Sequence, residues 1–250
     1  MRAQFEIKGK TYQIDLDFGI DISMAVSHQG VTAWYIPPAA ITPIQLDDFT
    51  GSIAEGASTN FNRIKFSPHS HGTHTETLWH VSRHERYVHQ CLHRNFFVAQ
   101  LFSFKPEILG NDRVITLDLF KKQLGDLPVP EAVIIRTLPV DEHNKERDFS
   151  NTNPPYLEPK LADFLAKNKV EQLLFDQVSV DKEKDGGALA AHKAFWQLPE
   201  QPRKNACITE LIFVEESILD GAYMLQIQAP AIINDAAPSR VTIFEILDIK

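Results

Sequence analysis

The chain has 250 residues, a hydrophobic content of 43% and a formal net charge of −8 at pH 7. This length allows one large domain or at most two, and the composition is that of an ordinary globular protein. Nucleic-acid binders usually carry a clustered basic surface, so the acidic balance predicts no nucleic acid partner. The two cysteines, Cys91 and Cys207, are too few for a disulfide framework or a four-thiolate zinc site, and we expect both to be buried.

No stretch of the sequence has the pattern of a membrane segment. The N-terminal MRAQFEIKGKTYQIDLDF alternates charges with single apolar residues, unlike a secretory leader. No later run approaches the roughly 18 apolar residues that a membrane span needs. We therefore expect a cytoplasmic protein with no membrane partner, folded as a single domain over residues 1–250.

The first half of the chain is predicted to contain mostly strands and loops. FEIKG and TYQIDLDF alternate apolar with polar residues around a turn at Gly9 and Lys10, which predicts an N-terminal hairpin. Residues 28–60 scatter Gly, Pro and Ser among aromatics and predict loops and short edge strands, so that 1–60 would supply a hairpin and one wall of a pocket. RHERYVHQCLHRNFF predicts a helix, and FVAQLFSF and RVITLDL predict strands.

The second half alternates predicted strands and helices. Residues 118–124 and LEPKLADFLAKNKV predict helices, and EAVIIRTL and LLFDQVSVD are apolar runs typical of buried strands. ALAAHKAFWQ, residues 188–197, predicts another helix, and ITELIFVEES, AYMLQIQA and RVTIFEILDI predict three more strands, the last two around the turn-rich INDAAPS. The strand, helix, strand order predicts an α/β fold with at least one parallel strand pair.

Residues 69–80 read HSHGTHTETLWH and hold four of the ten histidines. Imidazole is the commonest metal ligand, so this cluster suggests a metal site, although surface histidines also cluster by chance. If residues 70–76 are extended, the period of two places Ser70, Gly72, His74 and Glu76 on one face. His74 and Glu76 could then bind one ion.

The other histidines of this stretch fit an extended geometry less well. His69 and His71 would face the opposite way, at the surface or supporting the site, unless the strand bulges near Gly72. His80 can return to the site only if the chain bends near Thr77, and beside a metal it would suit a general base.

Two further pairs, His80 with His84 and His89 with His93, have i, i+4 spacing, but no HExxH motif accompanies them. We expect His84, His89 and His93 to be helix-surface or packing residues.

Two residues far along the chain are candidates for the same site. His192 lies in an otherwise apolar predicted helix, and Glu210 lies among the apolar residues of ITELIFV. An unpaired carboxylate in such a strand is unusual, and a metal would satisfy both side chains. Four aromatic residues could also line an apolar pocket for a small-molecule substrate, with core packing as the alternative for each: Trp34, Tyr35, Trp79 and Trp196.

The histidine-rich stretch resembles the signature HxGTHxDxPxH of the cyclase family of metal-dependent hydrolases, whose best-known members are bacterial kynurenine formamidases. The GTH element is intact at Gly72, Thr73 and His74, and His80 matches the closing histidine. The resemblance covers roughly residues 60–250, with the N-terminal part matching only loosely.

Later segments share the resemblance. LLFDQVSVD resembles the family's Asp-x-x-Ser-x-Asp element, with Asp176, Ser179 and Asp181 at its landmarks. His192 and Glu210 lie where the family keeps its late histidine and glutamate ligands, and YMLQIQAP and PSRVTIFEI resemble its closing strands.

The resemblance implies a swivelling β/β/α fold, a mixed sheet with a barrel-like core and flanking helices, in a homodimer or homotetramer. It implies a divalent metal, zinc or manganese, bound by His74, Glu76, His192 and Glu210, with His80 as the acid/base residue. The implied activity is hydrolysis of a C–N amide bond, formamide-like, or of a cyclic ester or amide.

Three positions depart from the signature: Ser70 replaces the first histidine ligand, Glu76 an aspartate and Leu78 a proline. Glutamate keeps the charge, but a neutral hydroxyl is a weak ligand for such an ion. Either His69 or His71 substitutes through a bulge, or the site has one ligand fewer.

The Pro-rich spacer after His192 also leaves Glu215 or Glu216 as alternatives to Glu210 as the late ligand. The missing histidine favours a catalytically silent relative that binds metal or assembles, whereas the retained His80 favours an enzyme.

Overall fold

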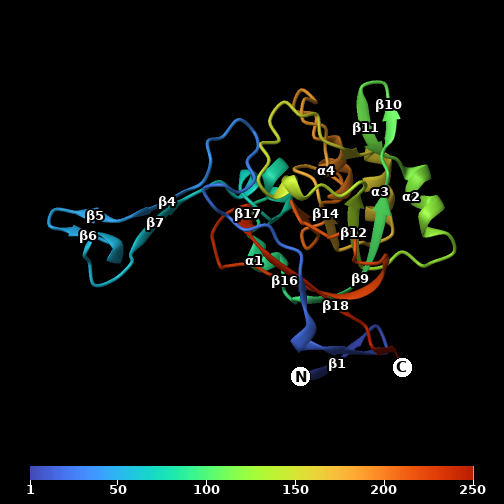
Figure 1. Cartoon of the computed structure of the whole chain (residues 1–250). Helices are drawn as coiled ribbons and strands as arrows, with labels where there is room; N and C mark the ends of the chain where they lie inside the picture. Colours follow the sequence, from blue (N-terminus) through green and yellow to red (C-terminus); the bar gives the residue numbers. More distant parts are fainter. Residues whose placement is uncertain (250) are drawn as a thin grey trace.

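The computed structural model describes residues 1–249 and is built around a curled, mixed sheet of nine strands (Figure 1). The strand order is β17-β8-β15-β14-β12-β9-β16-β18-β3. The strands are β3 (Ile20–Asp21), β8 (His74–Glu76), β9 (Phe96–Phe104), β12 (Ala132–Thr137), β14 (Gln172–Phe175), β15 (Cys207–Glu210), β16 (Gly221–Gln228), β17 (Ala236–Pro238) and β18 (Arg240–Glu245).

The centre of this sheet is parallel and buried on both faces. Strands β9, β12, β14 and β15 pair in parallel, as the strand, helix, strand order predicts. Along β12 the side chains of Val133 and Ile135 enter one apolar cluster, and those of Ala132 and Ile134 enter another on the opposite face. A strand covered on both sides needs an unbroken apolar run, which explains the sequence EAVIIRTL.

Four α-helices cover the two faces of the sheet: α1 (Val88–Cys91), α2 (Leu117–Leu124), α3 (Pro159–Lys167) and α4 (Ala190–Phe195). The last three pack on one face, through Phe120, Leu161 and Phe195 among others, and α1 packs on the other. The helix predicted over RHERYVHQCLHRNFF is wrong except for the single turn α1. Only this turn buries residues at helical spacing, and Phe96 already starts the long strand β9.

Two smaller sheets lie beside the main sheet. The predicted N-terminal hairpin is confirmed as β1 (Arg2–Ile7) and β2 (Lys10–Asp15), and β19 (Asp248–Ile249) adds a third strand to it. The second small sheet consists of β10 (Glu107–Leu109), β11 (Asp112–Ile115) and β13 (Tyr156–Leu157). The 3-10 turns are η1 (Leu16–Phe18), η2 (Ile53–Glu55), η3 (Pro68–Ser70), η4 (Leu78–Val81) and η5 (Glu142–Lys145).

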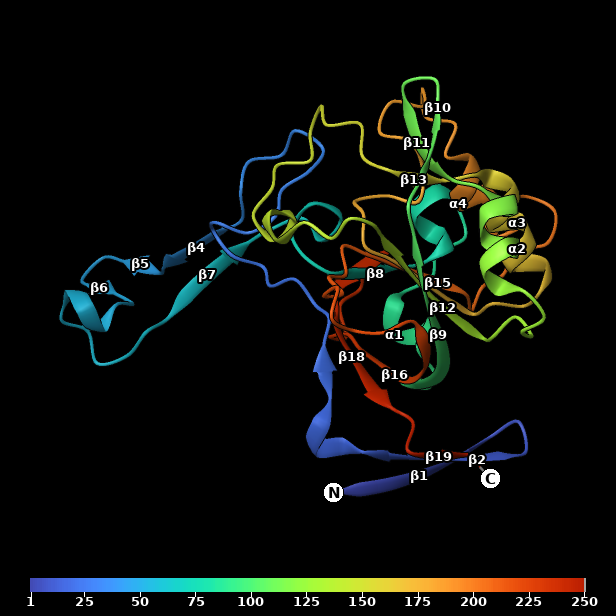
Figure 2. The same cartoon turned by 45° about the vertical axis from the view of Figure 1, so that its right-hand side comes forward.

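Residues 40–65 form an arm that projects from the body of the protein (Figure 2). Its stem is β4 (Ala40–Pro43) paired with β7 (Asn62–Lys65), and its tip is β5 (Gln45–Leu46) paired with β6 (Phe49–Thr50). The predicted short edge strands are therefore present, but most of the segment expected to form a pocket wall points away from the sheet. Within residues 1–249, no helix is long and apolar enough to cross a membrane.

Candidate metal centre

The pairing of two strands creates the core of the site. β8 and β15 are antiparallel neighbours, with Glu210 opposite His74 and Ile208 opposite Glu76. Residues opposite each other share a face of the sheet, and residues two apart along a strand share it too. The side chains of His74, Glu76 and Glu210 therefore converge, as the period of two predicts for the first two.

His192 reaches the same point from helix α4. Its Nε2 atom lies 2.9 Å from Oε1 of Glu76 and 3.6 Å from Oε1 of Glu210. Nε2 of His74 lies 3.5 Å from Oε2 of Glu210. The structure thus brings together, in a fully buried cluster, the four residues that the family resemblance implies as ligands.

Asp181 orients His192 from behind. Its carboxylate accepts hydrogen bonds from the backbone N–H groups of Ala191 and His192 and lies 2.6 Å from Nδ1 of His192. Histidines that bind metals usually donate their second ring N–H to such a carboxylate, which fixes the ring. The resemblance marked Asp181 as a landmark, and the structure shows what it contacts.

The fifth member of the cluster is His69, which differs from the extended geometry predicted for residues 70–76. Residues 68–70 form the 3-10 turn η3, and Gly72 has a φ of +85°. The strand begins only at His74, so the alternation that turned His69 away does not apply. Its Nδ1 lies 3.1 Å from Oε2 of Glu76.

Ser70, at the end of this turn, and His71, which follows it, make no hydrogen bond to the cluster among residues 1–249. Nδ1 of His71 accepts a hydrogen bond of 2.9 Å from the backbone N–H of Ser67, and its Nε2 lies 3.0 Å from the carbonyl oxygen of Pro37. His71 therefore ties the two ends of the arm together. The buried hydroxyl of Ser70 has no hydrogen-bond partner in the described part of the chain.

His80 returns to the site because the chain turns into η4, whose first turn Thr77 caps. This confirms the predicted bend. Nε2 of His80 lies 3.9 Å from Oε2 of Glu76, and Nδ1 lies 3.2 Å from Oδ2 of Asp235. The same oxygen of Asp235 lies 3.0 Å from Nε2 of His69. Sequence reasoning missed Asp235, which stands in the turn-rich INDAAPS without any local signal of function.

The carboxylates and imidazoles of the cluster shift one another's pKa values. Burial alone would raise the pKa of Glu76, but the imidazoles of His80 and His192 hold it well below its usual range. Burial would lower the pKa of His69, but the carboxylates of Asp235 and Glu76 raise it to about 10. The carboxylates around His192, Glu76 first, likewise raise the pKa of that imidazole well above its usual value against the effect of burial.

The donor atoms present fit a divalent metal ion. Nε2 of His74 is buried without a hydrogen-bond partner among residues 1–249, and buried polar atoms are rarely left so; the one close neighbour of Oε2 of Glu76 among these residues is the imidazole of His69. Within residues 1–249, three groups of side chains each have possible ligand atoms within 4.8 Å of one another. The groups are His69, His74 and Glu76; His69, His80 and Asp235; and Glu76, His80 and His192. Imidazole and carboxylate donors suit zinc and manganese.

The remaining candidate ligands lie elsewhere. His84 and His93 are exposed, and His89 is half-buried against the ring of Tyr87, as surface or packing residues should be. Glu215 and Glu216 are exposed beyond the end of β15 and take no part in the cluster. Cys91 and Cys207 are buried free thiols, as predicted.

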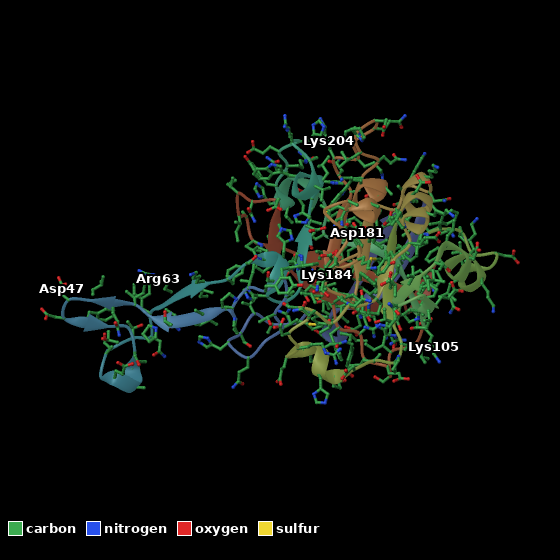
Figure 3. All side chains as sticks on the ribbon, turned by 90° about the horizontal axis from the view of Figure 1, so that it is seen from above. Asp47, Arg63, Lys105, Asp181, Lys184 and Lys204 are labelled. Carbon is green, nitrogen blue, oxygen red and sulfur yellow. The ribbon has the colours of Figure 1, made fainter. Side chains whose placement is uncertain are left out.

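A cavity of about 330 Å³ opens onto the cluster. Its lining includes Trp34, Ile36, His69, Ser70, His80, Asp181, Lys182 and Glu210. Figure 3 shows Asp181 and Lys184 within the body of the protein, far from the arm. The indole N–H of Trp34 donates a hydrogen bond of 3.0 Å to the carbonyl oxygen of His69, so this aromatic wall is joined to the turn that carries the histidine.

The other three aromatic residues do not line this cavity. Trp196 is completely buried and donates its indole N–H to the carbonyl oxygen of Ala206, so it is a core residue. Trp79 packs edge-on against Tyr87. Tyr35 is exposed and lies 2.9 Å from the carboxylate of Glu183 through its hydroxyl. Of the four candidate aromatic residues, Trp34 therefore lines the cavity, and Trp196 has the core-packing role that was its alternative.

Comparison with known proteins agrees with this architecture. The structure is similar to a potential metal-dependent hydrolase with cyclase activity (TM-score 0.65, 17% identity, 91% of this chain and 97% of the other). It is similar to a predicted metal-dependent hydrolase from Bacillus stearothermophilus (TM-score 0.65, 18% identity, 91% of this chain and 98% of the other). It is also similar to an isatin hydrolase bound to the product analogue thioisatinate (TM-score 0.64, 16% identity, 91% of this chain and 92% of the other). These likenesses confirm the predicted fold class.

A search of the curated proteins finds no match. The sequence model of the Cyclase family matches residues 20–182, well over half of the chain and including both the GTH element and Asp181. The protein therefore belongs to the cyclase family.

Proposed function

We propose that this protein is a metal-dependent hydrolase that cleaves a C–N amide bond or a cyclic ester or amide of a small molecule. The observation that carries the proposal is the convergence of His74, Glu76, His192 and Glu210, in which Nε2 of His74 is buried without a hydrogen-bond partner among residues 1–249. Burying several ionisable side chains together is costly, and a bound cation would offset that cost. The cavity beside them gives a substrate access.

His74, Glu76, His192 and Glu210 would hold the ion, with His69 in the place of the family histidine that Ser70 replaces. When bound, a divalent metal polarises a substrate carbonyl and lowers the pKa of water. Both imidazole and carboxylate donors are present, so zinc and manganese are the ions we propose.

His80 is placed to move the proton. Its side chain is 28% exposed at the cavity, whereas the side chains of His74, Glu76, His192 and Glu210 are buried. The carboxylate of Asp235 lies beside Nδ1, so a neutral His80 in this role would donate from Nδ1 to Asp235 and use Nε2, the atom nearer to Glu76, to accept a proton. His80 would take a proton from water and pass it to the leaving nitrogen or oxygen.

The cavity and the related structures support a choice of substrate class. One wall is the indole of Trp34 with Ile36, which suits a flat, apolar ring, and the rest of the lining is polar. One similar structure is an isatin hydrolase. We therefore favour cyclic amides, with aryl formamides as the second class.

The test combines metal analysis with assays of isatin, formanilide and a lactone, with and without chelator. We expect bound metal and chelator-sensitive hydrolysis. In His80→Gln, kcat should fall by about 10²- to 10⁴-fold, the usual share of general acid–base catalysis, while metal content stays unchanged. Glu210→Gln should lose metal, and the exposed Glu216→Gln is the matched control.

A catalytically silent relative that binds metal is the second candidate, and Ser70 in the place of a ligand histidine is the observation that favours it. Metal binding without hydrolysis of any of these substrates would support that candidate. A metal-free protein without chelator-sensitive activity would contradict the proposed hydrolase.

A further inference from the structure

A second cavity, with a volume of about 280 Å³, lies outside the metal centre. Pockets for small molecules begin at about 300 Å³, so this cavity has room for a compact ligand. It shares no lining residue with the cavity that opens onto the metal cluster. The proposed hydrolysis makes no use of it.

This second cavity lies at the carboxyl ends of three parallel strands. Lys105 follows the last residue of β9, Thr137 is the last residue of β12, and Gln177 lies two residues beyond β14. The three strands are parallel neighbours, so their carboxyl ends share one edge of the sheet. Open α/β sheets usually bind ligands at this edge, and Glu210 of the metal centre lies at the same edge, at the end of β15.

Two buried polar side chains of the lining are held in place by hydrogen bonds. Thr137 and Gln177 are only 7% and 3% exposed. The hydroxyl of Thr137 donates to the carboxyl of Asp176 at 2.9 Å and accepts a hydrogen bond of 2.6 Å from the side-chain N–H of Gln177. The polar part of the lining is therefore fixed before a ligand binds, which lowers the entropy cost of binding.

Basic side chains outnumber acidic ones around the cavity. Its charged lining consists of Lys105, Arg113, Arg147 and Asp141, whereas the whole chain has a net charge of −8. Arg147 and Asp141 form an ion pair with each other, but Lys105 and Arg113 have no acidic partner within residues 1–249. Two cations thus remain without a counter-charge at a concave surface, which concentrates their field and attracts anions.

The rest of the lining is largely apolar. Phe149 is buried beside the cavity, and Ile108, Leu138 and four prolines complete the apolar walls. Side chains of this kind cover a flat or branched apolar group and offer it no hydrogen bonds. A small inorganic ion would leave these walls in contact with water, whereas an anion with an organic body would cover them.

We propose that this cavity binds a small organic anion, which carries a carboxylate or a phosphate ester group. Lys105 and Arg113 bind the charged group, and Phe149 contacts the apolar body. One nitrogen of the Arg113 guanidinium donates a hydrogen bond of 2.9 Å to the carbonyl oxygen of Asn153, which leaves further N–H groups for the ligand. A guanidinium can donate two of these to either kind of oxyanion.

The experiment is a calorimetric titration of the full chain, as purified, with benzoate, phenyl phosphate, benzamide and inorganic phosphate. At least one of the two organic anions should bind with a dissociation constant below about 1 mM, which is within reach of a ligand of about ten heavy atoms. Benzamide lacks the charge and inorganic phosphate lacks the apolar body, so each should bind at least about tenfold more weakly. The stronger of benzoate and phenyl phosphate identifies the preferred anionic group.

Variants show whether the anion binds at this cavity. Lys105→Gln with Arg113→Gln should weaken binding of the organic anion at least about tenfold. The matched control, Arg63→Gln with Lys65→Gln, makes the same change in net charge on the exposed strand β7 and should bind like wild type. Figure 3 shows Lys105 on the body of the protein and Arg63 on the arm. All four side chains are exposed, so the thermal midpoints of both variants should match that of wild type.

Three results would overturn the proposal. The first is that neither organic anion binds below about 1 mM. The second is that benzamide or inorganic phosphate binds as tightly as the organic anions. The third is that the variant at Lys105 and Arg113 binds like wild type, as it would if the anion bound at the metal centre, or that the control variant is weakened equally. None of these results depends on whether the chain is a hydrolase.

Discussion

Replacing Asp235 by asparagine should weaken metal binding and catalysis together, although Asp235 lies outside the proposed set of ligands. One carboxylate oxygen of Asp235 lies 3.0 Å from Nε2 of His69 and 3.2 Å from Nδ1 of His80. It therefore fixes the ring orientation of both imidazoles at once. The variant Asp235→Asn keeps the shape of the side chain but removes its charge.

The size of the effect follows from these two contacts. A hydrogen bond to a charged group contributes about 1.5–3 kcal/mol, and a neutral one about 0.5–1.5 kcal/mol. Loss of the charge therefore costs about 1 kcal/mol per contact and about 2 kcal/mol for both, which is roughly a 30-fold change in an equilibrium constant. Removal of groups that orient metal-binding histidines typically costs about 10- to 100-fold, in agreement with this value.

The assay is a competition titration of zinc and of manganese against a chromophoric chelator, followed by kcat on the best substrate. The control is Asp163→Asn, which removes an exposed carboxylate paired with Lys167 on helix α3 and outside the cluster. An Asp235→Asn protein with metal affinity and kcat both within about twofold of wild type would refute the argument, because two such contacts cannot be lost without a measurable change.

Three further predictions concern residues whose positions the structure defines. His69→Ala should lower metal affinity at least about tenfold, whereas Ser70→Ala should not change it; calorimetric titration of the metal-free protein distinguishes the two. His71→Ala should leave metal content intact but lower the free energy of unfolding by about 1–3 kcal/mol, because it breaks two hydrogen bonds at the root of the arm; urea unfolding measures this. Burial raises the pKa of Asp176 from 3.8 to about 7, so the folded carboxyl keeps its proton at pH values where the unfolded one has lost it. The contribution of Asp176 to the free energy of unfolding should therefore fall by about 4 kcal/mol as the pH rises from about 4 to 7, and Asp176→Asn should lack this part of the slope in urea unfolding; equal slopes would contradict the assignment.

The sequence was sufficient wherever a local pattern decides the structure. Several predicted elements are present because each sequence pattern matches the period of its element. Examples are the alternation in FEIKG and TYQIDLDF, the apolar runs of β12 and β14, and the helical spacing of α3. The convergence of His74 with Glu76 is of the same kind. His192 and Glu210 were candidates because they are ionisable residues in apolar segments, and the family resemblance then implied that they are ligands.

The rest of the site depends on tertiary contacts that no local pattern encodes. Asp235 reaches His80, 155 residues earlier in the chain, because β17 pairs with β8 and places Ala236 opposite Glu76. The burial of Trp196 is decided by packing between α4 and the sheet, which its position at the end of an apolar helix does not reveal. The stretch before β8 was predicted as extended because its residue types do not distinguish a strand from a turn that follows Pro68.

That turn explains how the site tolerates serine in place of the family histidine. Side chains of neighbouring residues in a strand point in opposite directions, whereas in a 3-10 turn they point in directions only about 120° apart. His69 can therefore point at Glu76 although Ser70 occupies the signature position. The indole of Trp34 and the carboxylate of Asp235 hold it there.

A protein that had lost its metal would gain nothing from this arrangement. Buried ionisable groups cost several kcal/mol each, and replacing them with apolar residues is often neutral or stabilising. Glu76, His192 and Glu210 nevertheless remain buried beside His74, and His69 adds another imidazole to them. The position of His69 therefore favours a chain that still binds a metal over one in which the first ligand has simply disappeared.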